Sequence, residues 1–298
     1  MTGRRPAGRA GAAAVVLAVA ASLAACASGP TAAPTPPAPT RSPTSTVEYS
    51  PGLTEDVYLP DGPGQDGGQD GGRVPLVVMV PGGSWTTADP AGFAGLAAAL
   101  ADHGVAAAPT HIRAAQDGVT YPVPVEDVLC AAATAAQDVR RAGFVPDPVA
   151  VLGHSSGAHL AALAVLAVDD YAPTCDAPAV RPDALVGLSG PYDIAQVPDL
   201  AVALLGSDPD DDPDAWASAN PVDRADLRPD VPVLLLHGEA DTTVPVAFTD
   251  QFAEALQDGG HPTTVAVVAD ADHQTIYTAE VAADRVASWL LSQRMRHD

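Results

Sequence analysis

The stretch Val149–Ala158 constrains the fold more than any other part of this sequence. Its residues are Val-Ala-Val-Leu-Gly-His-Ser-Ser-Gly-Ala, so an apolar run typical of a buried strand leads into two glycines that flank Ser155. Leucines at helical spacing follow over Ala158–Val168. Such a turn is typical of a nucleophile elbow, in which backbone strain lifts a serine hydroxyl clear of the sheet. We therefore predict that Ser155 is a nucleophile; an idle serine in a tight turn is the alternative.

Strand-like and helix-like segments alternate along the rest of the chain. Strands are expected at Val47–Tyr49, Asp56–Tyr58, Val74–Val80, Val105–Ala108, Ala184–Leu188, Val231–Leu236 and Thr263–Val268. Helices are expected over Ala91–His103, from Val125 to Arg141, after Ser155, from Phe248 to about Gly259, and around Val286–Leu290. This alternation predicts an α/β fold with a doubly wound, mostly parallel sheet and helices on both faces. Ligands bind such sheets at the carboxyl ends of the strands.

The loops after two of these strands supply the partners that a serine nucleophile needs. A serine hydroxyl is a weak nucleophile, so a base, best supplied by histidine, removes its proton, and a carboxylate holds that histidine in one tautomer. Asp241 follows the strand that ends at Leu236, and His273 follows the last strand. We predict that Ser155 is the nucleophile, that Asp241 is the carboxylate and that His273 is the base. They follow one another in this order along the chain.

Other residues are alternatives for the carboxylate and for the base. Glu239 is the alternative to Asp241 as the carboxylate. His237 lies at a strand end beside a glycine, which favours packing, and His261 precedes a strand, which puts it at the wrong end of the sheet. His154 and His159 flank the elbow but are too close to Ser155 along the chain to fold back as its base.

Attack on a carbonyl also requires backbone N–H donors for the oxyanion that forms. One donor is expected from Ser156, directly after the nucleophile. The other is expected from Gly83 or Ser84, within Pro81-Gly82-Gly83-Ser84-Trp85, because small residues let the main chain approach a substrate. Trp85 either lines the substrate pocket or braces this loop.

Three motifs together resemble the α/β-hydrolase superfamily: Gly153-His154-Ser155-Ser156-Gly157-Ala158-His159-Leu160, Pro81-Gly82-Gly83-Ser84-Trp85 and His237-Gly238-Glu239-Ala240-Asp241. They are similar to the esterase/lipase branch with a His-Gly-Gly-x-Trp loop and to its arylformamidase-like and feruloyl- or acetyl-esterase-like relatives, over about Val47 to Arg296. The resemblance implies a hydrolase of small-molecule carboxylic esters, with small or medium acyl or aryl groups, that works through an acyl-enzyme without a metal or organic cofactor. Pro81 stands where the family's loop usually opens with His, which leaves the second donor open between Gly83 and Ser84.

Two other functions remain open at this point. The same residues suit an arylformamidase or another amide hydrolase. A non-catalytic binding lipoprotein on a hydrolase scaffold is the alternative from a different class, because a fold does not fix a function.

The charged residues exclude several classes of protein. All 14 residues counted as Lys+Arg are arginines, against 37 Asp+Glu, and the net charge is −23. The absence of lysine excludes two classes of enzyme: those with a lysine-containing phosphate-binding loop and those that form a Schiff base on lysine. The net charge argues against nucleic acid as a partner. The acidic run Ser207–Asp214 lacks the glycine and distal glutamate of an EF-hand loop, so we expect a solvated loop there and no metal site. The oligomeric state is left open.

The N-terminus is typical of a targeting segment. Arg4, Arg5 and Arg9 precede the apolar run Gly11–Ala25, and Leu23-Ala24-Ala25-Cys26 resembles the lipobox of bacterial lipoproteins. The resemblance implies a signal peptide over residues 1–26, a lipid on Cys26, and an exported protein anchored to the outer face of the bacterial cell membrane. An ordinary secretory signal is the alternative. Residues 27–46 are rich in Pro, Ala, Thr and Ser and are expected to form an extended tether.

Residues 47–298 are then expected to form the hydrolase domain. Cys130 and Cys175 remain as a pair in an oxidising compartment, which predicts a disulfide, with two separate buried thiols as the alternative. Segment 190–230 has many Pro and Asp residues and interrupts the strand–helix alternation. We expect it to form a cap over the site.

Overall fold

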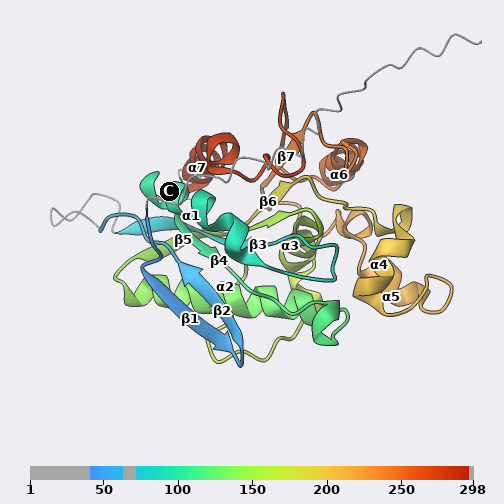
Figure 1. Ribbon diagram of the computed structural model, residues 1–298, viewed down its shortest axis with the longest axis horizontal. Coiled ribbons are helices and arrows are strands. Elements are labelled where there is room, and N and C mark those ends of the chain that lie inside the picture. The colour runs from blue at the N-terminus through green and yellow to red at the C-terminus, as the bar shows by residue number, and fades with distance from the viewer. Residues whose placement is uncertain (1–40, 63–71, 295–298) are drawn as a thin grey trace, which may run out of the picture. The chain divides into compact units, whose positions relative to one another are not determined.

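Six strands form one parallel sheet in the computed structural model, which describes residues 41–62 and 72–294 (Figure 1). The strands are β3 (Arg73–Val80), β4 (Ala106–Pro109), β5 (Val145–His154), β6 (Ala184–Leu188), β7 (Val233–Gly238) and β8 (Thr263–Val268). Their order is β4-β3-β5-β6-β7-β8, and all neighbours are parallel. The chain runs outward from β3 to β4, then returns to β5 on the other side of β3. This confirms the doubly wound α/β prediction and puts a crevice at the carboxyl ends of β3 and β5.

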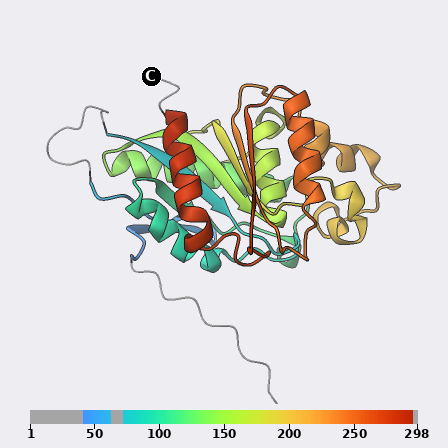
Figure 2. The same cartoon turned by 90° about the horizontal axis from the view of Figure 1, so that it is seen from above.

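Helices cover both faces of the sheet. One face packs against α1 (Ala94–Asp102) and α7 (Ala279–Arg294), and the other against α2 (Val123–Arg141), α3 (Ser156–Leu166) and α6 (Ala247–Asp258). Figure 2 shows α7 in red and α6 in orange at full length. Successive residues of β3 pack on opposite faces: Val77 and Met79 lie with α1 and α7, whereas Val80 lies with α3. Because both faces are covered, strands β4, β6 and β7 are buried throughout, whereas the edge strand β8 is mostly exposed.

An antiparallel hairpin precedes the sheet. Strand β1 (Ser45–Ser50) pairs with β2 (Leu53–Val57), and both contact the part of the domain near α2 and β4. The boundary expected between the tether and the domain, at residue 46, therefore falls inside β1. Arg41 already pairs with Asp61 and Asp102. Residues 1–26, Cys26 among them, and the tether up to residue 40 lie outside the described residues.

A disulfide joins Cys130, in the middle of α2, to Cys175, in the loop between α3 and β6. The Cα atoms are 5.4 Å apart, within the range that a disulfide spans without backbone distortion. This confirms the predicted pair. The cross-link ties a core helix to a loop that has little regular structure of its own.

Segment 190–230 forms two short helices, α4 (Pro198–Leu205) and α5 (Pro213–Ser218). Leu204 and Trp216 are buried in the same core cluster as α3, so the segment packs against the helix side of the domain at α3 and α6. Part of the acidic run starts α5, where the Asp212 side chain accepts a hydrogen bond from the Ala215 amide. Within residues 41–62 and 72–294, no helix has both the length and the apolar character needed to cross a membrane.

Candidate active site

Ser155 lies in a strained turn between β5 and α3. Its φ is 55° and its ψ is −130°, a conformation that a residue with a side chain rarely adopts. Both flanking glycines are sterically required: a Cβ on Gly153 would lie 2.1 Å from the Gly157 carbonyl oxygen, and one on Gly157 would lie 2.3 Å from that of Val80. The turn therefore depends on close contact among β5, α3 and β3.

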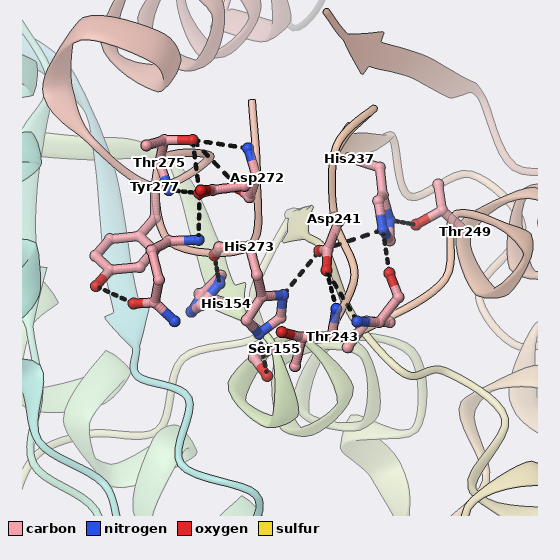
Figure 3. Close-up of polar contacts among 12 residues, drawn as sticks. His154, Ser155, His237, Asp241, Thr243, Thr249, Asp272, His273, Thr275 and Tyr277 are labelled. Carbon is pink, nitrogen blue, oxygen red and sulfur yellow. Dashed lines mark hydrogen bonds and ion pairs between the residues drawn. The ribbon is translucent and has the colours of Figure 1, made fainter. Parts of the chain in front are cut away.

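A chain of hydrogen bonds joins Ser155, His273 and Asp241 (Figure 3). The Ser155 Oγ and His273 Nε2 atoms are 3.0 Å apart, and His273 Nδ1 and Asp241 Oδ2 are 2.8 Å apart. Asp241 comes from the loop after β7 and His273 from the loop after β8, so loops of separate strands meet at one end of the sheet. The structure thus brings together the three residues that the sequence analysis named.

The main chain holds Asp241 as a hydrogen-bond acceptor. Its Oδ1 accepts from the amides of Thr243 (2.8 Å) and Val244 (2.9 Å), and its side chain has no exposed surface. Burial alone would raise the pKa of Asp241, but these amides and the His273 ring outweigh burial and lower the pKa below its usual value. The ionised carboxylate accepts the Nδ1–H of His273, which leaves Nε2 free to accept the proton of Ser155.

The competing residues have other partners. His237 is fully buried between the Thr249 hydroxyl (2.7 Å) and a main-chain carbonyl (2.8 Å), and it lies 3.5 Å from Asp241. His261 lies at the opposite end of β8, where its Nδ1 donates to a carbonyl oxygen at 2.9 Å. Glu239 is exposed, and it is Asp241 that meets the base.

The loop after β3 approaches Ser155 from the other side. A Cβ on Gly82 would lie 2.8 Å from the Cβ of Ser155, so Gly82 lets the loop contact the nucleophile. Gly83 has a φ of 147°, and a Cβ there would lie 2.1 Å from a main-chain oxygen of the same loop. Ser84 and Trp85 have φ values of 53° and 57°. The close approach at Gly82 agrees with the expectation that the small residues Gly82-Gly83-Ser84 let this loop come near the reacting groups.

Three amides, in the loop after β3 and at the start of α3, have no hydrogen-bond partner in the described protein. Within the described part of the chain, the N–H groups of Gly83, Ser84 and Ser156 donate to no protein acceptor. Ser156 is the first residue of α3, where N–H groups have no partner inside the helix and carry the positive end of its dipole. These are the amides that the sequence analysis named as oxyanion donors.

Trp85 braces the loop and also lines a hollow. Its Nε1–H donates to His159 Nδ1 at 3.2 Å, and the two rings meet edge to face with centroids 5.2 Å apart. The hollow beside Ser156 is walled by Trp85, Leu160 of α3 and Leu204 of α4, with Arg113 as its charged member. Segment 190–230 therefore contributes a wall next to the candidate site through Leu204.

His154 has a position that the sequence analysis did not foresee. It does not contact Ser155 as a base; instead, its Nε2–H donates to the main-chain oxygen of His273 at 2.8 Å. In the described residues, no group of three or more His, Cys, Asp or Glu side chains is arranged to hold a metal ion.

The chain is similar to known esterases. The model of a family described as BD-FAE matches residues 56–256. Esterase LipQ of Mycobacterium tuberculosis is 29% identical over 82% of this chain and 60% of its own length. Esterase LipC of the same organism is 31% identical over 61% of this chain and 48% of its own length. The chain thus spans only about half of the length of these curated relatives.

Solved structures share the fold. A truncated carbohydrate esterase from gut microbiota superposes with a TM-score of 0.67 at 21% identity, covering 81% of this chain and 90% of that one. Esterase 2 of Thermogutta terrifontis with bound propionate gives a TM-score of 0.62 at 22% identity, over 81% of this chain and 88% of that one. Both are α/β-hydrolases, as the sheet order and the elbow of this chain lead one to expect.

Proposed function

The chain belongs to the BD-FAE family, and we propose that it is a serine hydrolase that cleaves carboxylic esters through an acyl-enzyme. The observation that carries the proposal is the hydrogen-bonded chain from Ser155 Oγ through His273 to Asp241, beside unpaired main-chain amides. These parts supply a nucleophile, a base in a fixed tautomer and an oxyanion site, which are what acyl transfer requires.

The proposed reaction uses each of these parts in turn. Ser155 Oγ attacks the ester carbonyl carbon while His273 Nε2 takes the hydroxyl proton, and Asp241 stabilises the resulting imidazolium. The carbonyl electron pair moves onto the oxygen, which accepts hydrogen bonds from Ser156 and from the loop at Gly83. His273 then gives the proton to the leaving alcohol oxygen as the carbon–oxygen bond breaks. A water molecule repeats the sequence on the acyl-enzyme, releases the acid and returns the proton to Ser155.

The hollow beside Ser156 supports small acyl groups as the preferred substrates. Its cavity volume is about 10 Å³, close to the roughly 10–15 Å³ that one water molecule needs. Trp85, Leu160 and Leu204 form apolar walls. This small, largely apolar space favours a short acyl chain over a long one.

The test combines covalent labelling with turnover. The domain from residue 41 onward is treated with a fluorophosphonate, the adduct is located by mass spectrometry, and hydrolysis of p-nitrophenyl acetate, butyrate and octanoate is measured. We expect one adduct, on Ser155, and the highest kcat/KM for the acetate. The Ser155→Ala variant should lose the adduct and at least about 10³-fold in kcat.

The control is Ser189→Ala, because Ser189 also directly follows a strand of the sheet, the neighbouring β6, but is fully buried. It should keep both the adduct and the activity. Labelling elsewhere, or full activity of Ser155→Ala, refutes the proposed nucleophile. Faster turnover of N-formyl arylamines than of every ester would move the assignment to an arylformamidase with the same three residues.

We also propose that the protein is exported and anchored to the outer face of the bacterial membrane by a lipid on Cys26. The Cys130–Cys175 disulfide supports export, because disulfides persist in oxidising compartments. Full-length protein labelled with a fatty acid should carry the label in the membrane fraction, and Cys26→Ala should not. A soluble, unlabelled wild-type protein refutes the anchor.

A further inference from the structure

His154 connects the strand that carries Ser155 to the loop that carries His273 (Figure 3). It is the last residue of β5, and its Nε2 lies 2.8 Å from the main-chain oxygen of His273. Because a carbonyl oxygen only accepts, Nε2 must bear the proton of this ring. The ring is buried, with 6% of its surface exposed, and its centroid lies 4.7 Å from the His273 ring and 4.4 Å from the Tyr277 ring.

The loop after β8 needs a contact that holds it at a fixed distance from β5. Its internal shape is set by Asp272, whose Oδ1 accepts from the amides of Gln274 and Thr275. On the side of Asp241, the Ala271 carbonyl oxygen accepts from the Ala240 amide at 2.9 Å. Neither contact fixes the distance from the loop to β5, whereas the bond from His154 spans that gap directly.

We propose that His154 is a positioning residue, which holds the backbone of His273 so that Nε2 of that residue meets Ser155 Oγ. The inference rests on the proposed function, because it concerns the same nucleophile and base. The other ring nitrogen faces the loop after β3: a Cβ on Gly82 would lie 3.3 Å from His154 Nδ1. One imidazole thus packs against both the loop that carries the base and the loop that carries the oxyanion donors.

The chemistry of the ring suits this role. Burial, and then the neighbouring His273, lower the pKa of His154 to about 3. His154 is therefore neutral near pH 7. A neutral ring holds the loop without opposing the positive charge that His273 gains during attack, whereas a lysine or arginine in the same place would repel it.

The test compares His154→Leu, His154→Gln and His154→Asn, with kcat and KM for p-nitrophenyl acetate and the rate of fluorophosphonate labelling as readouts. Leucine removes the donor, and asparagine is too short to reach the His273 oxygen. Both should lower kcat and the labelling rate by about tenfold or more with KM nearly unchanged, since small misplacements of reacting groups have effects of this order. Glutamine places an amide donor near the position of Nε2 and should restore most of the loss.

His261→Leu is the matched control. His261 is also buried, with 4% exposed, and also donates to a main-chain oxygen, but it lies at the opposite end of β8. It should lower the thermal midpoint as His154→Leu does while leaving kcat unchanged. If His154→Leu does not fold, the difference in kcat between His154→Gln and His154→Asn tests the role of His154. Equal kcat for Gln, Asn and wild type, with Ser155→Ala inactive, overturns the role of His154 alone; an active Ser155→Ala overturns the proposed function instead.

Discussion

His159 makes the stability of this protein depend on pH, and its geometry sets the sign and size of the effect. The side chain is fully buried in α3; its Nε2–H donates to the Ala219 carbonyl oxygen at 2.8 Å, and its Nδ1 accepts from Trp85 at 3.2 Å. The bond from Trp85 requires the neutral ring, since protonated Nδ1 cannot accept, whereas Nε2–H donates to Ala219 in either protonation state. Burial lowers the pKa of His159 to about 4, only partly offset by the bond to Ala219.

The free energy follows from the difference between the folded and unfolded states. An unfolded chain binds the proton with a pKa of about 6.5, so between pH 6.5 and 4 the unfolded state holds more protons and gains stability as the pH falls. The contribution of His159 is fully favourable above pH 6.5 and declines below it. With 1.36 kcal/mol per pH unit, lowering the pH from 7 to 5 should reduce the free energy of unfolding by about 2 kcal/mol through this residue alone.

The assay is urea unfolding, followed by tryptophan fluorescence, of wild type and His159→Gln at pH 7 and pH 5. Glutamine does not titrate, so the loss between the two pH values should be smaller in the variant by about 2 kcal/mol. Other titrating groups, His154 and the carboxylates included, contribute equally to both proteins and cancel in this difference. Equal losses in both proteins would refute the reasoning, because His159 would then accept a proton as readily in the folded state as in the unfolded one.

Two further predictions concern the acid and the cross-link. Asp241→Asn should lower kcat for p-nitrophenyl acetate by about 10⁴-fold with little change in KM, because the amide cannot fix the productive tautomer of His273; a loss below tenfold would contradict its role. Replacing Cys130 and Cys175 by alanine should lower the free energy of unfolding by about 4 kcal/mol, since the disulfide closes a loop between positions 45 residues apart. Identical denaturation midpoints with and without a reducing agent would count against that value.

The sequence was sufficient for the sheet and the three central residues because each carries a local signal. The apolar runs that became β3, β5 and β7 are buried on both faces, so they are apolar without alternation. Ser155 is marked by glycines whose role is steric, and the chain order placed Asp241 and His273 after the correct strands. Element boundaries were less accurate: α1 begins at Ala94 after a short 3-10 turn, although its pattern predicted a start at Ala91.

The remaining features depend on contacts between distant segments. Nothing in the sequence around His154 indicates that its ring reaches a main-chain oxygen 119 residues away. The two interpretations of Trp85 also needed the fold, because the residue both braces the loop through His159 and lines the hollow. The small residues around Gly82 indicate a close approach, but only the fold shows that Gly82 contacts Ser155.

The order of the strands also determines when the site is completed during synthesis. Ser155 precedes His273 by 118 residues, and β8 is the outermost strand on its side of the sheet. A nascent chain that has emerged only as far as α6 contains Ser155 and Asp241 but not His273. Such a chain has no base to activate the hydroxyl and cannot attack esters that it meets on the way. The site therefore becomes able to react only after β8 and the following loop with His273 have been synthesised. The other strands of the sheet are by then available for β8 to pair with.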